Sequence, residues 1–402
     1  TSVACCPLSL WIILFGLSSA SLHKMTLIIV IQLLLHLFLT AKACTEIRVT
    51  TEDKSTVVIG RSMEWSSDLR SDIIVEPQGY FHKVNLSVNC TNTDHAGAPL
   101  QDWTNRYTVI YLNAFRQDIA SDGMNSEGLS VGALYLPDFT TYQEVCGSLC
   151  NKSSISNLQL PQLILGNFAT VQEVQEALNN GSFPLVFDQK VMLNLSEIDR
   201  PLYTLEIHYS IYDKTGAGII IEFTNKGRTV YENTVGVCTN SPPYDFHMIN
   251  LRNYVELNKT AHEALHLGGD VFTPLGQGSG LLGTPGDLTP PSRLVRAATL
   301  THFADPVKTS DEAVNLAIHI LNTVDIPHGV ADKDYTNWIV AKDLTHKALY
   351  YRTYNDLTVR VIYLDKVQPQ GKMLKLPLST PVGGFKDTTD ELKTVDGGHT
   401  EL

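Results

Sequence analysis

The feature that most constrains the fold of this chain is an apolar leader that stops directly before a cysteine, Cys44. Residues 27–39 are mostly apolar, and Ala41-Lys42-Ala43 after them has the small-x-small pattern of a leader cleavage site. We therefore predict that residues 1–43 are a leader, in which an upstream segment precedes a signal peptide that starts at Met25 and ends at Ala43. The folded domain then begins with Cys44 as its first residue.

A retained membrane anchor is the alternative to a cleaved leader. The two apolar runs, residues 8–22 and 27–39, are each shorter than the roughly 20 residues that a spanning helix needs. We therefore expect no stable membrane insertion after processing.

The charge balance limits the partners of the processed chain. The 402 residues carry a net charge of −12, and removal of the leader takes away basic side chains but no acidic one. Because an acidic surface repels nucleic acids and anionic lipids, we predict no nucleic-acid partner. The sequence does not decide between a monomer and a homo-oligomer. We expect the domain to span residues 44–368, because residues 369–402 have the Pro, Gly and Thr content of a disordered tail.

The cysteines and the glycosylation sequons favour an oxidising, secretory compartment. Cys146 and Cys150 are spaced for a local disulfide, the pairing of Cys90 is not readable, and Cys238 lies in an apolar run typical of a buried free thiol. Sequons of the Asn-x-Ser/Thr type occur at Asn85, Asn89, Asn151, Asn180, Asn194 and Asn258. We predict a glycoprotein that is secreted or held in a lumenal, lysosome-like compartment.

Alternating apolar residues predict mostly antiparallel strands. A hairpin is expected from residues 46–51 and 56–60, joined by a polar turn. Further strands are predicted at 72–76, 107–112, 129–136, 203–212, 218–223, 228–232, 337–343, 348–352 and 358–364. Helices are predicted at 171–178 and after the capping box of Thr309 and Glu312. Two groups of strands with helices between them indicate an α+β fold of stacked, helix-covered sheets.

Two familiar motifs lack the structural context that they need. Gly128-Leu129-Ser130-Val131-Gly132 matches the nucleophile elbow of serine hydrolases, but the strand pattern continues past Ser130 and leaves no place for the sharp turn. Residues 278–283 match a dinucleotide fingerprint, but Pro274 and Pro285 stand where a strand and a helix are required. We predict no cofactor and no metal site.

A chain cleaved before Cys44 would carry a nucleophile and a base on one residue. A free thiol has a pKa of about 8.5 and an α-amine one of about 8, so the two groups exchange protons near neutral pH. A nearby cation favours the thiolate, and the hairpin that begins at Cys44 returns Arg61 to its neighbourhood. Glu64 could hold the ammonium group in position. This is the logic of N-terminal nucleophile hydrolases.

Short blocks in a fixed order carry a stronger signal than any single motif. They are Cys44-Thr45, residues 60–65, 122–125, Gly128-Leu129, Thr239-Asn240, residues 245–248, 250–254, 285–287, 291–293 and 354–356. In these blocks the chain resembles the choloylglycine hydrolase family, which includes conjugated bile acid hydrolases and penicillin V acylases. The resemblance implies the Ntn-hydrolase fold, a four-layer αββα sandwich of two antiparallel sheets between helical layers.

The resemblance also implies a role for each site residue. Cys44 matches the nucleophile and Arg61 the arginine beside it. Glu64 lies where the family usually has an aspartate that contacts the α-amine. Asn240 matches the asparagine of the oxyanion hole, and Arg293 matches a second arginine that stabilises charge.

Tyr135 completes the implied site and bears on the substrate. Its backbone N–H would join the Asn240 amide in binding the oxyanion. Bile acid hydrolases tend to have asparagine at this place and penicillin V acylases tyrosine, which favours penicillin V-like or other N-acyl amides over bile salts. We therefore predict an enzyme that hydrolyses a linear, non-peptide amide of a small-molecule substrate through a thioester.

Each of these residues also has an explanation without catalysis. Isolated charges such as Arg293 most often form surface ion pairs, and Asn240 precedes two prolines, as turn residues do. A cysteine after a leader can be a lipoprotein acylation site, although Lys42 fits that pattern poorly. The alternative function is a catalytically inactive, secreted binding protein with the same fold, which Glu64 in place of aspartate favours.

Overall fold

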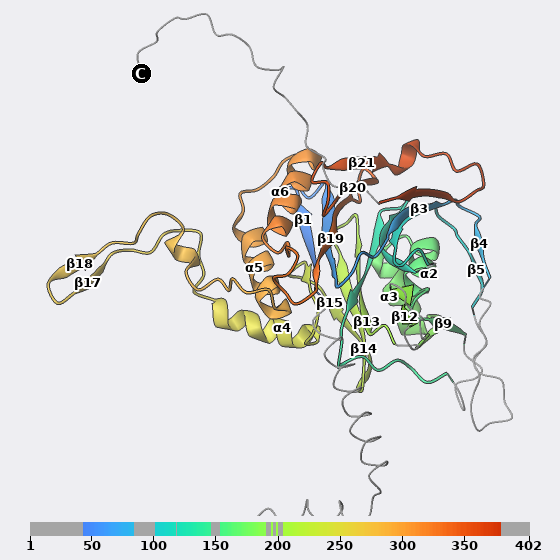
Figure 1. Ribbon diagram of the computed structural model, residues 1–402, viewed down its shortest axis with the longest axis horizontal. Coiled ribbons are helices and arrows are strands. Elements are labelled where there is room, and N and C mark those ends of the chain that lie inside the picture. The colour runs from blue at the N-terminus through green and yellow to red at the C-terminus, as the bar shows by residue number, and fades with distance from the viewer. Residues whose placement is uncertain are drawn as a thin grey trace, which may run out of the picture. The chain divides into compact units, whose positions relative to one another are not determined.

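Two antiparallel sheets lie between layers of helices in the part of the chain that the computed structural model describes, which is residues 43–83, 101–117, 119–145, 153–189, 194–195, 198–199 and 204–378 (Figure 1). The predicted leader up to residue 42 lies outside these residues. So do Cys90, Cys146 and Cys150, together with the sequons at Asn85, Asn89 and Asn151.

The first sheet contains the start of the domain. Its strands lie in the order β16-β1-β2-β19-β20-β21, each antiparallel to its neighbours. They are β1 (Cys44–Thr50), β2 (Val57–Trp65), β16 (Val237–Cys238), β19 (Tyr335–Asp343), β20 (Ala348–Thr353) and β21 (Arg360–Tyr363). β1 and β2 form the predicted hairpin, and their register places Met63 opposite Cys44 and Arg61 opposite Glu46.

The second sheet has eight strands in the order β15-β14-β13-β8-β7-β6-β3-β22. They are β3 (Asp72–Glu76), β6 (Val109–Asn113), β7 (Ala120–Asn125), β8 (Leu129–Tyr135), β13 (Ile207–Asp213), β14 (Gly218–Thr224), β15 (Gly227–Glu232) and β22 (Leu374–Pro377). Short pairs lie outside the two sheets: β4 (Phe81–His82) with β5 (Trp103–Thr104), β9 (Ser154–Ser156) with β10 (Leu185–Phe187), and β11 (Asn194–Leu195) with β12 (Ile198–Asp199).

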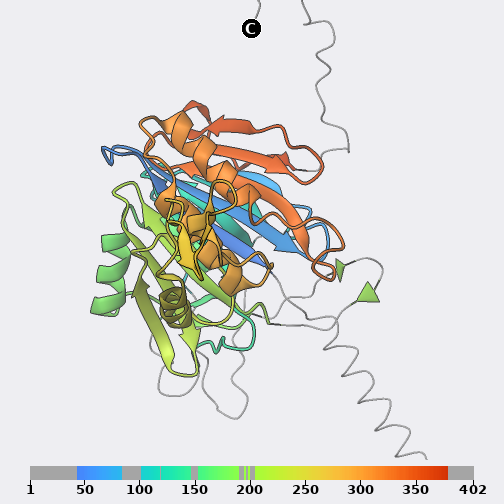
Figure 2. The same cartoon turned by 90° about the vertical axis from the view of Figure 1, so that its left-hand side faces the viewer.

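Helices cover the outer face of each sheet. α5 (Pro290–Phe303) and α6 (Ser310–Asn322) pack on the first sheet, in front of which they lie in Figure 2. α2 (Leu160–Asn167) and α3 (Val171–Asn180) pack on the second sheet. This layering confirms the αββα sandwich. The remaining helical pieces are α4 (Tyr244–Asn250), η2 (Leu251–Tyr254), η3 (Ser279–Leu281) and η4 (Leu364–Lys366).

The alternation of side chains along β2 decides which residues reach the space between the sheets. Val58 packs in the apolar cluster under α5 and α6, whereas Arg61 points to the second sheet and donates to backbone carbonyls there. Gly60 faces α6, where a Cβ would lie 2.9 Å from Leu321 Cδ1 and 3.3 Å from Ala317 Cβ. A side chain at residue 60 would crowd α6, so the glycine lets this helix pack closely on the sheet next to Arg61.

Several elements that the sequence did not predict are polar or begin with proline. β7 has the sequence ASDGMN, which shows no apolar alternation, yet it is buried along its whole length because Asp122 and Asn125 find partners inside the fold. α5 begins with two prolines, which suit the first turn of a helix but obscure the apolar spacing. The ordered chain also extends past residue 368, where we predicted a disordered tail, because β22 pairs with β3.

An arm of chain separates α4 from α5. It contains β17 (Leu265–Leu267) and β18 (Asp270–Phe272), whose residues are all exposed (Figure 1). The arm also contains His262-Glu263-Ala264-Leu265-His266, which spells the H-E-x-x-H zinc pattern and which our metal-free prediction overlooked. That pattern binds zinc from one face of a helix, whereas here it runs from a loop into a strand. Among the helices of the described residues, none is long and apolar enough to cross a membrane.

Candidate active site

Cys44, the first residue of β1, lies between the two sheets with only 3% of its surface exposed. It is joined to Ala43 by a peptide bond, and the Ala43 carbonyl accepts the backbone N–H of Glu64 at 3.0 Å. The backbone N–H of Cys44 donates to Asn240 Oδ1 at 2.5 Å. The Ala43–Cys44 bond is therefore seated within the candidate site.

Arg61 places a fixed positive charge beside the Cys44 sulfur. Its Nη2 lies 3.6 Å from Cys44 Sγ and donates to the Ala133 carbonyl at 2.6 Å. Its Nη1 donates to the Ser121 carbonyl at 2.5 Å. Both carbonyls belong to the second sheet, so the guanidinium group bridges the sheets and its orientation is set by backbone atoms.

Arg61 belongs to a buried cluster of four charged side chains. Lys342 Nζ lies 2.5 Å from Asp122 Oδ1 and 3.2 Å from Glu46 Oε1, while Arg61 Nη1 lies 3.5 Å from Asp122 Oδ1. Ser210 donates to Glu46. All four charged side chains are fully buried, and two cations balance two anions, as burial requires. The sequence did not point to Glu46 or Lys342, because neither lies in a recognisable motif.

Asn240 and Arg293 approach Cys44 from the loop after β16 and from α5. Asn240 Oδ1 accepts from Arg293 Nη2 at 2.9 Å as well as from the Cys44 N–H, and Asn240 Nδ2 donates to the Tyr135 carbonyl at 2.7 Å. Arg293 Nη1 also donates to the Cys44 carbonyl at 2.7 Å and to Thr45 Oγ1 at 2.5 Å. Because a carboxamide nitrogen carries two hydrogens, Asn240 keeps a second N–H that can serve an oxyanion.

Glu64 is close to the site but bonds to Thr336. Its Oε1 accepts from Thr336 Oγ1 at 2.7 Å, while its Oε2 is buried without a hydrogen-bond partner among the described residues. Burial raises the pKa of Glu64 to about 7, although the nearby Arg293 opposes this shift. The Cys44 nitrogen, which we predicted Glu64 to hold, bonds to Asn240 in the uncleaved chain.

The Cys44 thiol is held in its protonated form. Burial raises its pKa above the ordinary value, and Glu64 acts in the same direction. Arg61 opposes both effects through its charge and its hydrogen bond, but burial is the largest influence. A change that brings solvent to the sulfur would weaken that influence and leave the Arg61 cation to favour the thiolate.

An apolar cavity of about 50 Å³ opens at the Cys44 sulfur. Its wall includes Met63, Trp65, Leu69, Phe115, Ile119, Tyr135, Leu205 and Ile207. The Trp65 ring stands edge-on to the rings of Phe115 and Tyr135, with centroids 5.5 and 6.1 Å away. Cys44 therefore forms part of the wall of an apolar, aromatic pocket.

The structure brings all six predicted site residues, Cys44, Arg61, Glu64, Tyr135, Asn240 and Arg293, together around the start of β1. Two residues outside our predicted set also belong there, since Trp65 lines the cavity and His247 Nε2 lies 2.8 Å from the Asn240 carbonyl. Ser130 is buried within β8 and is not on an elbow. No group of three or more His, Cys, Asp or Glu side chains in the described residues could hold a metal ion.

Comparison with known proteins matches this arrangement to one family. Residues 44–374 match the family described as linear amide C-N hydrolases, choloylglycine hydrolase family. A bile salt hydrolase/transferase from Clostridium perfringens is 31% identical over 341 residues, which are 83% of this chain and 95% of the relative. A penicillin V acylase from Pectobacterium atrosepticum is 25% identical over 346 residues, which are 80% of this chain and 81% of that protein.

A solved structure shares the fold. It is a variant of the conjugated bile acid hydrolase from Clostridium perfringens, which superposes with a TM-score of 0.69 at 28% sequence identity. The superposition covers 89% of this chain and 100% of the other. The two-sheet core described above is therefore shared with a hydrolase of known structure.

Proposed function

The chain belongs to the choloylglycine hydrolase family of linear amide C–N hydrolases, and on this basis we propose that it hydrolyses N-acyl amides with Cys44 as the nucleophile. The observation that carries the proposal is the position of the Cys44 sulfur. Arg61 Nη2 lies 3.6 Å from it, and the Asn240 carboxamide bonds to the backbone of the same residue.

The proposed reaction needs Cys44 to be the first residue. Its α-amine accepts the thiol proton, and the sulfur attacks the amide carbonyl carbon, which moves the negative charge to oxygen. The second N–H of the Asn240 amide and the backbone N–H of Tyr135 stabilise that oxyanion. The C–N bond breaks as the ammonium group protonates the leaving amine, and a thioester remains. Water, deprotonated by the same amine, then releases the carboxylic acid and restores the thiol.

The uncleaved chain is a latent form in this proposal. With Ala43 attached, the Cys44 nitrogen is an amide without basicity, its N–H occupies Asn240 Oδ1, and burial keeps the thiol protonated. Cleavage after Ala43 would turn the Cys44 nitrogen into an α-amine and so supply the base. We propose that the Ala41-Lys42-Ala43 signal directs this cleavage in the secretory pathway.

The cavity supports a slim, apolar acyl group as substrate. Its volume of about 50 Å³ is far below the roughly 300 Å³ at which pockets for drug-sized ligands begin. The walls are apolar and aromatic, with Trp65, Phe115 and Tyr135 around the sulfur. We therefore propose that the acyl part is an alkyl chain or a single aryl ring. The fused rings of a bile salt, the substrate named for the Clostridium perfringens relative, would require these walls to move.

A substrate panel tests this proposal. The processed enzyme is assayed with penicillin V, glycocholate and N-acyl amides of increasing chain length, after its intact mass confirms a start at Cys44. We expect turnover of slim acyl amides, with kcat/KM at least about tenfold above that for glycocholate. Equal or faster cleavage of glycocholate would contradict the substrate class, and no cleavage of any amide by the correctly processed chain would contradict the function.

A cavity variant sharpens the same test. Phe115→Ala removes an aromatic wall and should raise the ratio of glycocholate to penicillin V turnover about tenfold. Phe183→Ala is the matched control, because Phe183 is equally buried but does not line the cavity. If both variants leave the ratio unchanged, Phe115 does not set the acyl specificity.

We further propose that the protein is an exported glycoprotein. The support is the leader pattern and the sequons, of which Asn180 and Asn258 have exposed side chains. Expression in a eukaryotic secretory host should yield protein that begins at Cys44 and loses mass on treatment with peptide N-glycosidase. Retention of residues before Cys44, or no loss of mass, would contradict the corresponding part of this proposal.

A further inference from the structure

The loop from Thr239 to Ser241 carries the oxyanion asparagine and is held by side chains rather than by a strand ladder. It joins β16 to α4, and Pro242 and Pro243 after it have no N–H to donate. The Thr239 carbonyl accepts from His208 Nε2 at 2.9 Å, and the Asn240 carbonyl accepts from His247 Nε2 at 2.8 Å. Ser241 Oγ donates to the Pro137 carbonyl at 2.7 Å.

The protonation of both imidazoles follows from their partners. A carbonyl oxygen can only accept, so Nε2 must carry the hydrogen in each bond. Burial lowers the pKa of His247 to about 4, and its Nδ1 has no partner among the described residues, so His247 is neutral with its hydrogen on Nε2. His208 Nδ1 lies 3.0 Å from Glu222 Oε1, within hydrogen-bond distance.

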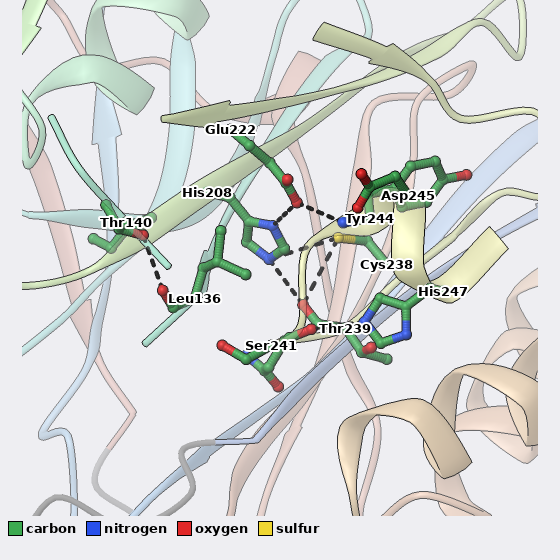
Figure 3. A network of polar contacts seen from close by, with 12 residues as sticks. Leu136, Thr140, His208, Glu222, Cys238, Thr239, Ser241, Tyr244, Asp245 and His247 are labelled. Carbon is green, nitrogen blue, oxygen red and sulfur yellow. Dashed lines mark hydrogen bonds and ion pairs between the residues drawn. The ribbon is translucent and has the colours of Figure 1, made fainter. Parts of the chain in front are cut away.

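Glu222 ties this network to the neighbouring helix (Figure 3). Its Oε1 accepts from the backbone N–H of Tyr244, the first residue of α4, at 2.9 Å. The same carboxylate therefore orients His208 and fixes the start of the helix that carries His247. Glu222, His208 and His247 are each 1% exposed or less.

Cys238, His208 and Glu222 together resemble a second nucleophile site, because a thiol, an imidazole and a carboxylate follow one another. Its sulfur lies 3.9 Å from His208 Nε2 and 3.8 Å from the Thr239 carbonyl (Figure 3). However, His208 already directs its Nε2 hydrogen to that carbonyl at a much shorter distance, so it cannot act as a base for the thiol. The chemistry of this group is to hold the loop.

We propose that His208 and His247 are positioning residues for the oxyanion hole. They bind the carbonyl of Thr239, which precedes Asn240, and the carbonyl of Asn240 itself. This inference rests on the proposed function. An oxyanion donor must be in place before charge develops, and a displacement of about 1 Å can cost about a hundredfold in rate. Glu222 acts on Asn240 only through His208.

Paired substitutions test the proposal in the processed enzyme. His208→Leu and His247→Leu remove the N–H donor, whereas His208→Gln and His247→Gln keep an N–H at the position of Nε2. We expect each Leu variant to lower kcat 10- to 100-fold with KM changed less than threefold, and each Gln variant to recover most of the loss. Alkylation of Cys44 by iodoacetamide should stay within threefold of wild type, since the thiol itself is untouched.

His82→Leu is the matched control. His82 is a buried imidazole that bonds to Glu76 at 2.9 Å, and it contacts no residue of the site. The His82→Leu variant should have a lower thermal unfolding temperature, as the other Leu variants do, but its kcat should stay within threefold of wild type. The proposal is overturned if the folded His208→Leu and His247→Leu variants keep wild-type kcat, or if His82→Leu reduces kcat as much as they do.

A second readout does not depend on turnover. Selective ¹⁵N-asparagine labelling, with Asn240→Ser for assignment, reports the environment of the Asn240 carboxamide. We expect its NH₂ signal to shift in the Leu variants and to stay in place in His82→Leu. An unshifted signal overturns the positioning role even if no substrate has been found, whereas a shifted signal in an enzyme that cleaves no amide supports the positioning and contradicts only the proposed function.

Discussion

Cys44 and Cys238 lie on paired strands of the same sheet, and both are free, buried thiols. β1 and β16 are in register with Cys238 opposite Glu46, two residues after Cys44. Their exposed fractions are 3% and 1%, and burial raises the pKa of each thiol. Burial and thiol chemistry alone therefore do not distinguish the two positions.

The two cysteines differ in the groups that face the sulfur. Arg61 points a cation at Cys44 and is held there by backbone carbonyls, whereas His208 beside Cys238 gives its hydrogen to the Thr239 carbonyl. Cys44 also lines the apolar cavity, which gives an acyl group a place to bind. A cysteine with an imidazole and a carboxylate nearby, such as Cys238, is not thereby a nucleophile. The neighbouring N–H donor must point at the sulfur, and the substrate needs a cavity beside it.

The largest expected difference between the two positions is in activity. Cys44→Ala should lower kcat/KM by about 10⁴-fold or more, because the bond-forming atom is lost. Cys238→Ala should stay within about threefold of wild type, with a loss of about 1–2 kcal/mol in the free energy of unfolding from the small cavity. Steady-state kinetics and urea unfolding of both variants check this, and activity retained in Cys44→Ala would refute the assignment of the nucleophile.

The Glu64 carboxylate near Cys44 should make the stability of the fold depend on pH. Glu64 has its pKa raised from 4.5 to about 7 in the folded chain, so its contribution to stability is complete below about pH 4.5 and is lost as the pH rises through 7. Glu64→Gln removes this loss and should stabilise the chain by up to about 3 kcal/mol at pH 8, with little effect at pH 4.5. Thermal or urea unfolding of the chain that retains Ala43 measures the difference.

Glu222→Leu is the comparison for that experiment. Glu222 Oε1 bonds to both His208 Nδ1 and the Tyr244 N–H, so removal of this oxygen breaks existing bonds and should destabilise the fold. If Glu64→Gln is no more stable than wild type at pH 8, the Glu64 carboxylate has a favourable partner that the uncleaved structure does not reveal.

The alkylation rates of Cys44 and Cys238 should differ by about a hundredfold. In the processed enzyme, iodoacetamide at pH 7.5 should modify Cys44 about 100 times faster than Cys238, since only Cys44 has a cation directed at its sulfur and a cavity beside it. Peptide mass spectrometry over time gives both rates. Equal rates would mean that the environment of Cys44 does not activate it.

The smallest predicted effect isolates the charge of Arg61. Arg61→Gln removes the group that lowers the pKa of the Cys44 thiol, so alkylation at pH 7.5 should slow about tenfold and its pH profile should move to higher pH. Arg48→Gln is the control, because Arg48 binds the carbonyls of Gly216 and Thr234 instead of a thiol. An unchanged profile in Arg61→Gln would show that the thiolate forms without this cation.

The local part of the site could be predicted from the residues alone. The alternation of apolar side chains on both sides of a polar turn fixes the β1–β2 hairpin, and a hairpin of known register returns Arg61 to Cys44. Asn240 and Arg293 are 196 and 249 residues away from Cys44, and only the family resemblance pointed to them. Nothing in the sequence indicated that Glu46 and Lys342 are buried as an ion pair. Strand alternation shows to which face of the sheet a side chain points, but not whether water reaches that face.

The sequence by itself determined the strands with apolar alternation, the β1–β2 hairpin, the capped helix after Thr309 and the single cysteine that a leader would expose, because these depend on periodicity and on neighbours along the chain. Only the tertiary structure decided which polar groups are paired in the dry space between the sheets. The pKa of Glu64, the protonated state of the Cys44 thiol and the two imidazoles that hold the Asn240 loop all depend on how completely water is excluded and on which distant groups replace it.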